Sequence, residues 1–171
     1  MDGTAEDAFR EFVTARSAAL LRSAYLLVGD RGKAEDLLQV TLLKMYLQWR
    51  RIKDPGAAEG YARRAMVNTA TSWWRRRSYR ERSVDAVPEH GGTDEIAARV
   101  EHDAMWQHLQ GLPVRQRAVV VLRYYEGMSE AEIAEVLDIS RGTVKSHAAR
   151  ALGTLRRKFQ DEDAHQERVT L

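Results

Sequence analysis

Apolar side chains recur along this chain at intervals of three and four residues, which is the spacing of an amphipathic helix. No sustained alternation of apolar and polar residues indicates a strand, and only three prolines interrupt 171 residues. The sequence therefore predicts an all-α fold with short connections. In the N-terminal half we expect helices over about 6–27, 33–50 and 57–82, separated by turn signals at 29–32 and 53–56.

The same spacing predicts which side of each N-terminal helix faces inward. The expected inward residues are Phe9, Val13, Leu20, Ala24 and Leu27 in the first helix and Leu38, Leu42, Met45 and Trp49 in the second. The opposite edge of the second helix carries Asp36, Gln39 and Leu43, spaced by three and four residues. From periodicity alone, ordinary solvent exposure explains Asp36 and Gln39.

Two further helices are expected over about 96–110 and 114–127, with Gly111-Leu112-Pro113 between them. The first would bury Val100, Ala104, Met105 and Leu109, and the second would bury Ala118, Leu122 and Tyr125.

Two short helices joined by a tight turn follow, over about 129–137 and 140–152. Ser129 and Glu132 have the spacing of a capping box, and Ser140 is placed to cap the second of these helices. Val144, Ala148 and Leu152 repeat at four-residue steps and are expected to face inward.

The outward side of that last helix is cationic. It presents Arg141, Lys145, Ser146, Ala149 and Arg150, and no acid occurs between Arg141 and Lys158. A capped helix, a turn and a helix with one apolar and one cationic face are typical of a helix-turn-helix, whose second helix lies in the DNA major groove. The alternative is a helical hairpin with a solvated charged face, although such faces usually mix both signs.

The expected helix over 57–82 carries a second nucleic-acid signal. From Tyr61 to Arg82, seven arginines stand against the single acid Glu81, interleaved with Tyr61, Trp73, Trp74 and Tyr79. Cations attract a phosphate backbone, and flat rings stack on unpaired bases. At least one of the two adjacent tryptophans is nevertheless expected to be a core residue. An RNA-binding adaptor that uses this helix is one alternative function.

Composition excludes several classes of function. The charge is nearly balanced, with 27 Lys and Arg against 25 Asp and Glu, so its distribution carries the argument. The absence of cysteine excludes disulfides, thiolate metal sites and cysteine catalysis. The five histidines form no metal-ligand spacing, and no nucleophile motif or glycine-rich phosphate loop occurs, so we expect neither a cofactor nor an enzyme. An acidic start and the lack of a long apolar run predict a soluble, cytoplasmic protein without membrane insertion.

Composition also predicts the domain organisation. The segment 83–95 is polar and acidic, with a proline and two adjacent glycines, and is expected to be a flexible linker. It separates an N-terminal domain over 1–82 from a C-terminal domain over 96–160. The acidic tail over 161–171 is expected to fray.

Three groups of residues resemble segments of bacterial RNA polymerase sigma factors. The stretch AEDLLQ over 34–39, followed by Trp49, is similar to their polymerase-binding helix. The stretch YARRAMVN over 61–68, with RRR over 75–77, resembles their helix for the downstream promoter element. LPVRQR over 112–117, LRY over 122–124 and GTVKS over 142–146, with Ser129 and EIA over 132–134, resemble their upstream-element domain. The likeness is to the extracytoplasmic-function (ECF) group, in particular its sigma-E-type actinobacterial members, and runs from about 9 to 159.

This resemblance implies a role for individual residues. Those matching the upstream-element surface are Arg123, Arg141, Lys145, Ser146, Ala149 and Arg150. Those matching the downstream, single-strand surface are Tyr61, Arg63, Arg64, Asn68, Ser72, Arg75 and Arg76, with the loop 54–60 as the pocket for a flipped base. Asp36, Gln39 and Leu43 match the surface that docks on the clamp helices of core polymerase. Val40 and Ser72 depart from the family, which usually has acids at both positions.

The resemblance implies a promoter-specificity subunit with core RNA polymerase and promoter DNA as partners, and family habit adds a possible anti-sigma factor. His147 lies among the groove-reading positions, where a phosphate contact and plain exposure are both open. The main alternative function is a stand-alone helix-turn-helix regulator that binds duplex DNA without polymerase.

Overall fold

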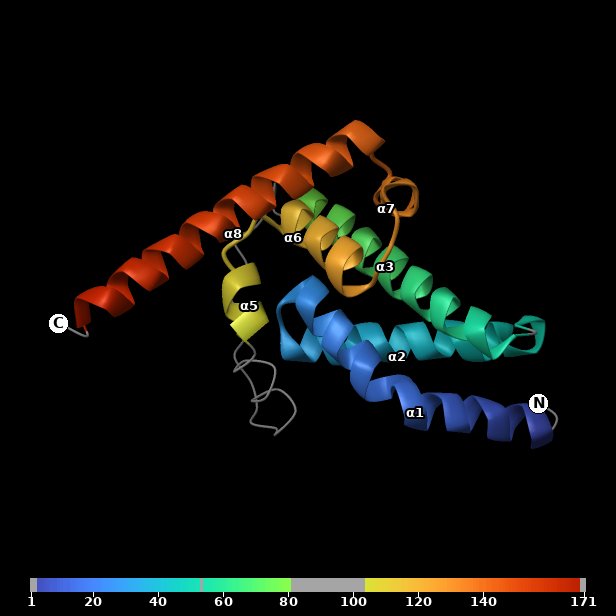
Figure 1. Ribbon diagram of the computed structural model, residues 1–171. Coiled ribbons are helices and arrows are strands. Elements are labelled where there is room, and N and C mark those ends of the chain that lie inside the picture. The colour runs from blue at the N-terminus through green and yellow to red at the C-terminus, as the bar shows by residue number, and fades with distance from the viewer. Residues whose placement is uncertain (1–2, 53, 81–103, 170–171) are drawn as a thin grey trace. The chain divides into compact units, whose positions relative to one another are not determined.

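The computed structural model describes residues 3–52, 54–80 and 104–169, and all regular elements within these ranges are helical. The chain divides into two compact units, Met1–Asp94 and Glu95–Leu171, each of which is described by itself (Figure 1). The expected linker over 83–95 and the inward position of Val100 lie outside the described residues.

The first unit contains three long helices. They are α1 (Gly3–Val28), α2 (Arg31–Gln48) and α3 (Pro55–Arg80), and the short 3-10 turn η1 (Trp49–Arg51) follows α2. Gly29 ends α1 with φ of 71°, a conformation that glycine adopts without steric cost. Asp30 then caps α2, because its carboxylate accepts a hydrogen bond from the backbone N–H of Lys33 at 2.8 Å.

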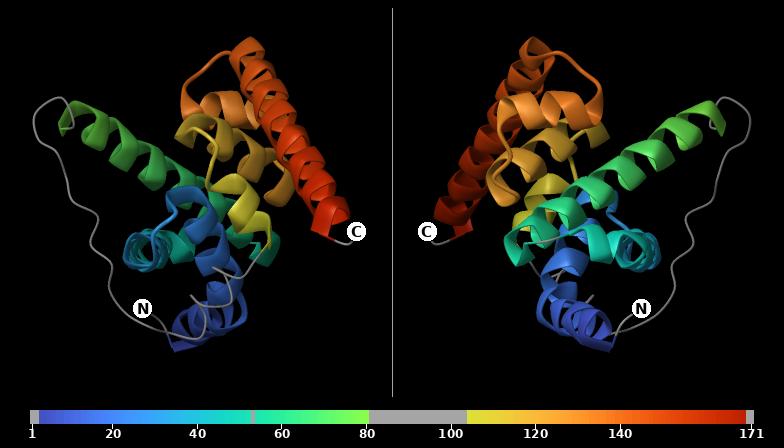
Figure 2. Two further views of the ribbon diagram at one scale, coloured as in Figure 1. Left: turned by 90° about the vertical axis from the view of Figure 1, so that its left-hand side faces the viewer. Right: turned by 90° about the vertical axis from the view of Figure 1, so that its right-hand side faces the viewer.

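Each of these helices packs against the other two. The views in Figure 2 show α3 crossing α2 at an angle, and α1 packs against both. The buried side chains include Leu20, Ala24, Tyr25, Leu26 and Leu27 of α1, Ala34, Leu37, Thr41 and Met45 of α2, and Ala58, Ala62, Ala65, Met66, Val67 and Ala70 of α3. The alanines of α3 allow its backbone to approach the neighbouring helices closely.

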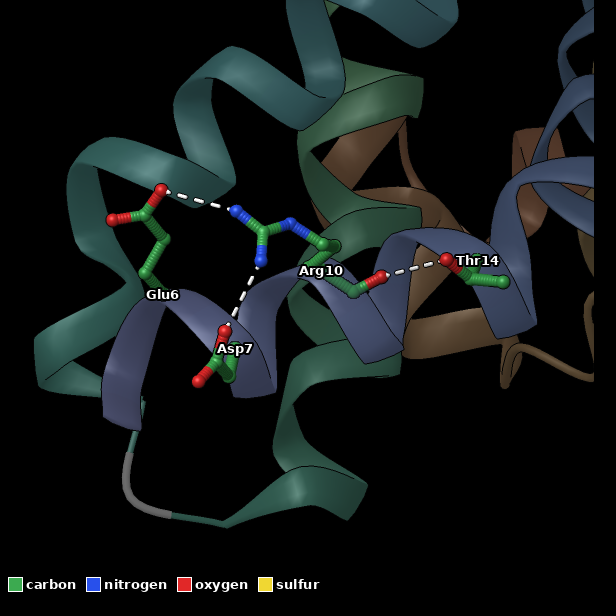
Figure 3. A network of polar contacts seen from close by, with 4 residues as sticks. All are labelled: Glu6, Asp7, Arg10 and Thr14. Atoms are coloured by element: carbon green, nitrogen blue, oxygen red, sulfur yellow. Dashed lines mark hydrogen bonds and ion pairs between the residues drawn. The ribbon is translucent and has the colours of Figure 1, made fainter. Parts of the chain in front are cut away.

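The N-terminal half of α1 is attached by aromatic contacts rather than by a buried stripe. Phe9 lies edge-on to Tyr46 and Trp49, with ring centroids 5.3 and 5.2 Å away, and is only partly buried. On the exposed side, Arg10 reaches back to Glu6 at 3.3 Å and Asp7 at 3.1 Å (Figure 3). Exposed pairs at this spacing contribute only a few tenths of a kcal/mol each.

The inward face of α2 differs from the prediction by one residue. Leu37 and Thr41 are buried with Met45, whereas Leu38, Leu42 and Trp49 are only partly buried. Leu37 and Leu38 are adjacent, and both begin an apolar-looking series. The series that contains Thr41 can be buried, because the Thr41 hydroxyl donates a hydrogen bond to the Leu37 carbonyl at 2.7 Å and so has a partner inside the helix.

Within the described residues, the second unit consists of four short helical segments followed by one long helix. They are α5 (Ala104–Leu109), α6 (Val114–Val120), the π-helical segment η2 (Val121–Tyr125), α7 (Glu130–Leu137) and α8 (Arg141–Val169). Its buried side chains include Trp106, Leu109, Leu112, Ala118, Val119, Val121, Leu122, Ile133, Leu137, Val144, Ala148 and Ala151.

The π-helical segment explains why one expected core residue is outside. Ala118 and Leu122 are buried as predicted, but Tyr125 is exposed. In η2 the backbone N–H of Glu126 bonds the carbonyl of Val121, five residues back, at 2.9 Å. The wider turn changes the helical register, so a four-residue count no longer identifies the inward face.

Both caps of the helix pair form as predicted. Ser129 and Glu132 make a complete capping box, and the Ser140 hydroxyl accepts from the backbone N–H of Thr143 at 3.0 Å. Asp138 forms the turn in the left-handed region with φ of 54°. Leu152 is exposed and Ala151 is buried in its place, because two four-residue steps overrun two helical turns by most of a residue.

Helix α8 continues to Val169, so residues 161–169, which were expected to fray, are helical. No glycine or proline interrupts the stretch after Gly153. Three residues at or just before the start of this extension contact His108 on α5. The Phe159 ring lies 4.4 Å from the His108 ring, Lys158 Nζ donates to the His108 carbonyl at 3.4 Å, and Glu162 Oε1 lies 3.8 Å from His108 Nδ1.

Candidate nucleic-acid interface

Helix α8 presents a cationic face on its N-terminal half. The five residues expected on this face, Arg141, Lys145, Ser146, Ala149 and Arg150, are all exposed. Successive members are four, one, three and one residues apart, so they lie on one side of the helix. Val144, Ala148 and Ala151 bury the other side, which packs against α6 and α7. The face therefore offers three cations and two small side chains, which permit close approach to a nucleic-acid groove.

Arg123 is partly buried beside this face and is engaged by an acid that the sequence analysis did not single out. Its Nη1 lies 2.7 Å from Oε1 of Glu130, and its guanidinium carbon lies 5.5 Å from the centre of the Tyr124 ring. Oε2 of Glu130 lies 3.9 Å from Nζ of Lys145. One carboxylate thus contacts two of the residues expected to bind DNA.

His147 is not plainly exposed. It is partly buried, and its Nδ1 has no hydrogen-bond partner among the described residues. Burial, followed by the charges of Arg150 and Arg115, lowers the pKa of His147 below its ordinary value of 6.5. The imidazole is therefore mainly neutral at pH 7 and adds little to the positive charge of the face.

Helix α3 brings most of the residues of the expected single-strand surface to one side. Tyr61, Arg64, Asn68, Ser72 and Arg75 follow each other at steps of three and four, which places them on one helical face. Arg64, Asn68 and Arg75 are exposed, as is the adjacent Arg76, and the other two are partly buried. The face combines cations, an amide, a hydroxyl and an aromatic ring, the groups that a splayed strand requires.

Arg63 does not belong to that face. Its Nη2 lies 2.8 Å from Oε1 of Glu59, and the other oxygen of Glu59 lies 3.2 Å from Nη2 of Arg16 on α1. The Glu59 carboxylate therefore links the Arg63 guanidinium to Arg16 of α1. The sequence pattern placed Arg63 with its neighbour Arg64, but adjacent residues of a helix point about 100° apart.

Two further expectations for α3 need correction. The segment 54–60 is not a loop, since α3 begins at Pro55 and only Asp54 precedes it, accepting from the backbone N–H of Gly56 at 3.0 Å. Neither Trp73 nor Trp74 is a core residue, because both are only partly buried. Asn68 has a buried neighbour, Thr69, whose hydroxyl accepts a hydrogen bond from Nζ of Lys44 at 2.7 Å and thereby joins α2 to α3.

The outer face of α2 carries all three residues expected to dock on polymerase. Asp36 and Gln39 are exposed, and the Leu43 side chain is 58% exposed. Leu47, which the sequence analysis missed, is 69% exposed. Its place four residues after Leu43 was visible in the sequence. Two leucines and two polar groups in one row are typical of a protein-binding surface.

The described ranges contain no helix long and apolar enough to cross a membrane. Within the same ranges, no group of three or more His, Asp or Glu side chains is arranged to hold a metal ion.

Comparisons with known proteins add to this geometry. A family model described as sigma-70 region 2 matches residues 12–80, and one described as sigma-70, region 4 matches residues 102–155. The RNA polymerase sigma-E factor of Streptomyces avermitilis is 42% identical over 155 residues, which cover 91% of this chain and 87% of the relative. The corresponding protein of Streptomyces coelicolor is 43% identical, covering 91% of this chain and 88% of the relative. The ECF RNA polymerase sigma factor SigL of Mycobacterium tuberculosis is 35% identical and covers 85% of each chain.

Solved structures with the same fold are more distant in sequence. The sigma factor RpoE of Bartonella quintana, solved with the anti-sigma factor NepR, is 23% identical with a TM-score of 0.63, covering 90% of this chain and 97% of that chain. CnrH, solved with the cytosolic domain of CnrY, is 22% identical with a TM-score of 0.58, covering 91% and 90% of the two chains.

Proposed function

Because this chain belongs to the ECF group of bacterial RNA polymerase sigma factors, we propose that it binds core RNA polymerase, recognises two promoter elements and promotes promoter opening. The observation that carries the proposal is that one chain holds both a region 2 and a region 4 match, and that each match contains an exposed cationic or polar helix face. A stand-alone duplex-binding regulator would not account for the region 2 match. An RNA-binding adaptor would not account for the region 4 match.

In this proposal the second unit reads duplex DNA at the upstream element. Lys145 and Arg150 contact base edges and phosphates from the exposed face of α8, with Arg141, Ser146 and Ala149 around them. A good bidentate base contact contributes about 1–3 kcal/mol of discrimination. Arg123, already oriented by Glu130, contributes a phosphate contact.

The first unit would hold the non-template strand of the downstream element. Asn68 lies at the centre of the face formed by Tyr61, Arg64, Ser72 and Arg75, where its amide can pair with the edge of an unstacked base. Because Arg63 is engaged by Glu59, we assign it to the support of this face rather than to the strand.

The free-energy cost of opening the DNA requires that polymerase participates. Opening about a dozen base steps costs on the order of 15 kcal/mol, whereas each base stacked on an aromatic ring returns about 1–3 kcal/mol. The face of α3 is therefore too small to hold a bubble alone, and we assign the outer face of α2 to docking on the clamp helices of the largest polymerase subunit.

The site of action would be the cytoplasm. A cognate anti-sigma factor belongs to the same proposal, because RpoE and CnrH were solved as complexes with their partners.

Run-off transcription with purified core polymerase tests the proposal, together with promoter binding and permanganate footprinting by the same holoenzyme. We expect Lys145→Ala/Arg150→Ala to reduce promoter occupancy by about 5- to 100-fold, because base contacts are lost. We expect Asn68→Ala to leave occupancy of the closed complex unchanged and to reduce the reactivity of unpaired thymines to permanganate. Arg168→Ala is the matched control for the first variant, since it removes an exposed cation from the same helix about 27 Å along its axis from Arg150. Failure of the wild-type chain to associate with core polymerase would refute the proposal.

A further inference from the structure

One acid, Glu130, contacts two cations of the surface that we assign to the upstream element. Glu130, at the first position of α7, contacts Arg123 of η2 at 2.7 Å and Lys145 of α8 at 3.9 Å. Each of its carboxylate oxygens faces a different cation. The side chains of Glu130 and Arg123 are 28% and 33% exposed, and that of Lys145 is 68% exposed.

The two contacts differ in strength and so in consequence. The contact with Arg123 is a short, charge-assisted hydrogen bond between partly buried groups, and the Tyr124 ring lies against the same guanidinium. It fixes the orientation of Arg123 while occupying only one of the five N–H donors of the side chain. The contact with Lys145 is long and exposed, so it restrains Lys145 only weakly.

The carboxylate of Glu130 therefore lies where a DNA phosphate would approach these two cations. We propose that Glu130 is a specificity-determining residue of the upstream-element surface, an inference that rests on the proposed function of α8. It opposes phosphate binding in every complex, and it holds Arg123 in the orientation that only the correctly seated duplex uses.

These two effects act differently in the two kinds of complex. Sequence-independent binding consists of attraction between cations and phosphates, so it experiences only the repulsion from Glu130. The specific complex experiences the same repulsion but also gains from an oriented Arg123 and from the base contact of Lys145. Glu130 thus lowers non-specific affinity more than specific affinity, which increases the ratio between them.

Two measurements on the full chain test this role. Free chain is titrated with poly(dI-dC) at about 50 to 200 mM salt, which measures non-specific affinity and its salt dependence. Holoenzyme is titrated with a short duplex selected from a random pool by wild-type holoenzyme, which measures specific affinity. The variants are Glu130→Gln, which removes the charge and keeps the shape, and Glu130→Asp, which keeps the charge and withdraws it from Arg123 by one methylene.

We expect Glu130→Gln to bind poly(dI-dC) about threefold more tightly, as one unit charge near a phosphate in a water-like dielectric predicts. The slope of log K against log salt should become steeper by up to about 0.9. Its affinity for the selected duplex should stay unchanged or fall, so the specificity ratio falls at least threefold. Glu130→Asp should resemble wild type on poly(dI-dC) and bind the selected duplex more weakly.

Glu135→Gln is the matched control, since Glu135 is an exposed acid on the same helix. It measures the effect of losing one acid from α7 without losing a contact to Arg123 or Lys145. The inference is refuted if Glu130→Gln and Glu135→Gln behave alike, or if Glu130→Gln tightens both complexes equally. The variant Lys145→Ala distinguishes failure of the inference about Glu130 from failure of the proposed function. If Lys145→Ala leaves binding of the selected duplex intact, the assignment of α8 to base reading is wrong whatever Glu130 does.

Discussion

The two exposed leucines of α2 give a quantitative prediction for polymerase binding. Burying a leucine side chain fully is worth about 1.5–3 kcal/mol, and Leu43 and Leu47 retain 58% and 69% of their exposure in the free chain. A partner that covers both gains on the order of 2–3 kcal/mol from them. Leu43→Ala/Leu47→Ala should therefore weaken association with core polymerase by roughly 30- to 150-fold.

The same double substitution should leave the stability of the chain nearly unchanged. Both side chains lie on the exposed face of α2, away from its buried residues, and alanine favours a helix at least as well as leucine. We expect the free energy of unfolding to change by less than about 0.5 kcal/mol. Loss of binding without loss of stability would identify a surface rather than a folding effect.

The assay is a titration of fluorescently labelled chain with core polymerase, read by anisotropy, with thermal unfolding measured on the same samples. Leu152→Ala is the control, because it removes the same atoms from a partly exposed position on α8 of the other unit. An affinity within twofold of wild type for the α2 double variant would show that polymerase does not cover this face. The assignment of Asp36, Gln39 and Leu43 would then fail with it.

Two further predictions concern the second unit. Ser129→Ala removes the capping box of α7 and should destabilise this unit by about 1 kcal/mol in chemical denaturation. Thr154→Ala, which removes a methyl group and a hydroxyl that bonds within α8, should cost far less. Equal losses of stability in the two variants would contradict the reasoning. His147, whose pKa is lowered by burial and by neighbouring arginines, binds a proton more readily in the unfolded chain. The folded state should therefore lose stability as the pH falls through 6.5. His147→Gln should reduce the difference in melting temperature between about pH 7.5 and pH 5, and an unchanged difference would argue against that shift.

Local signals in the sequence predicted local structure well. Ser129, Glu132 and Ser140 satisfy backbone groups within three residues of themselves, so no tertiary information is needed to place these caps. Helix faces were less predictable, because a count in steps of four drifts away from the true period over two turns. Leu152 illustrates that drift, and Tyr125 shows that a π-helical segment changes the period itself.

The candidate site was predictable to the extent that it lies on single helices. The face of α8 and most of the face of α3 follow from helical spacing once the helices are placed. The engagement of Arg63 with Glu59 and of Arg123 with Glu130 did not follow, because each depends on which of several possible partners the packed structure brings within reach. Arg123 lies within the π-helical segment and Glu130 seven positions later, beyond a turn, and no pairing rule covers that interval.

The two halves of the molecule present their functional faces by different means, and this affects how each will respond to change. In the first unit the faces of α2 and α3 share one core, in which Met45 of α2 is buried and the Lys44–Thr69 hydrogen bond joins the helices next to Asn68. Damage to that core should therefore impair polymerase docking and strand capture together. In the second unit the reading face depends on two caps and on the Glu130 contacts, all of them near the surface. Substitutions there should alter recognition of duplex DNA while polymerase docking through α2 persists, because α2 makes none of those contacts.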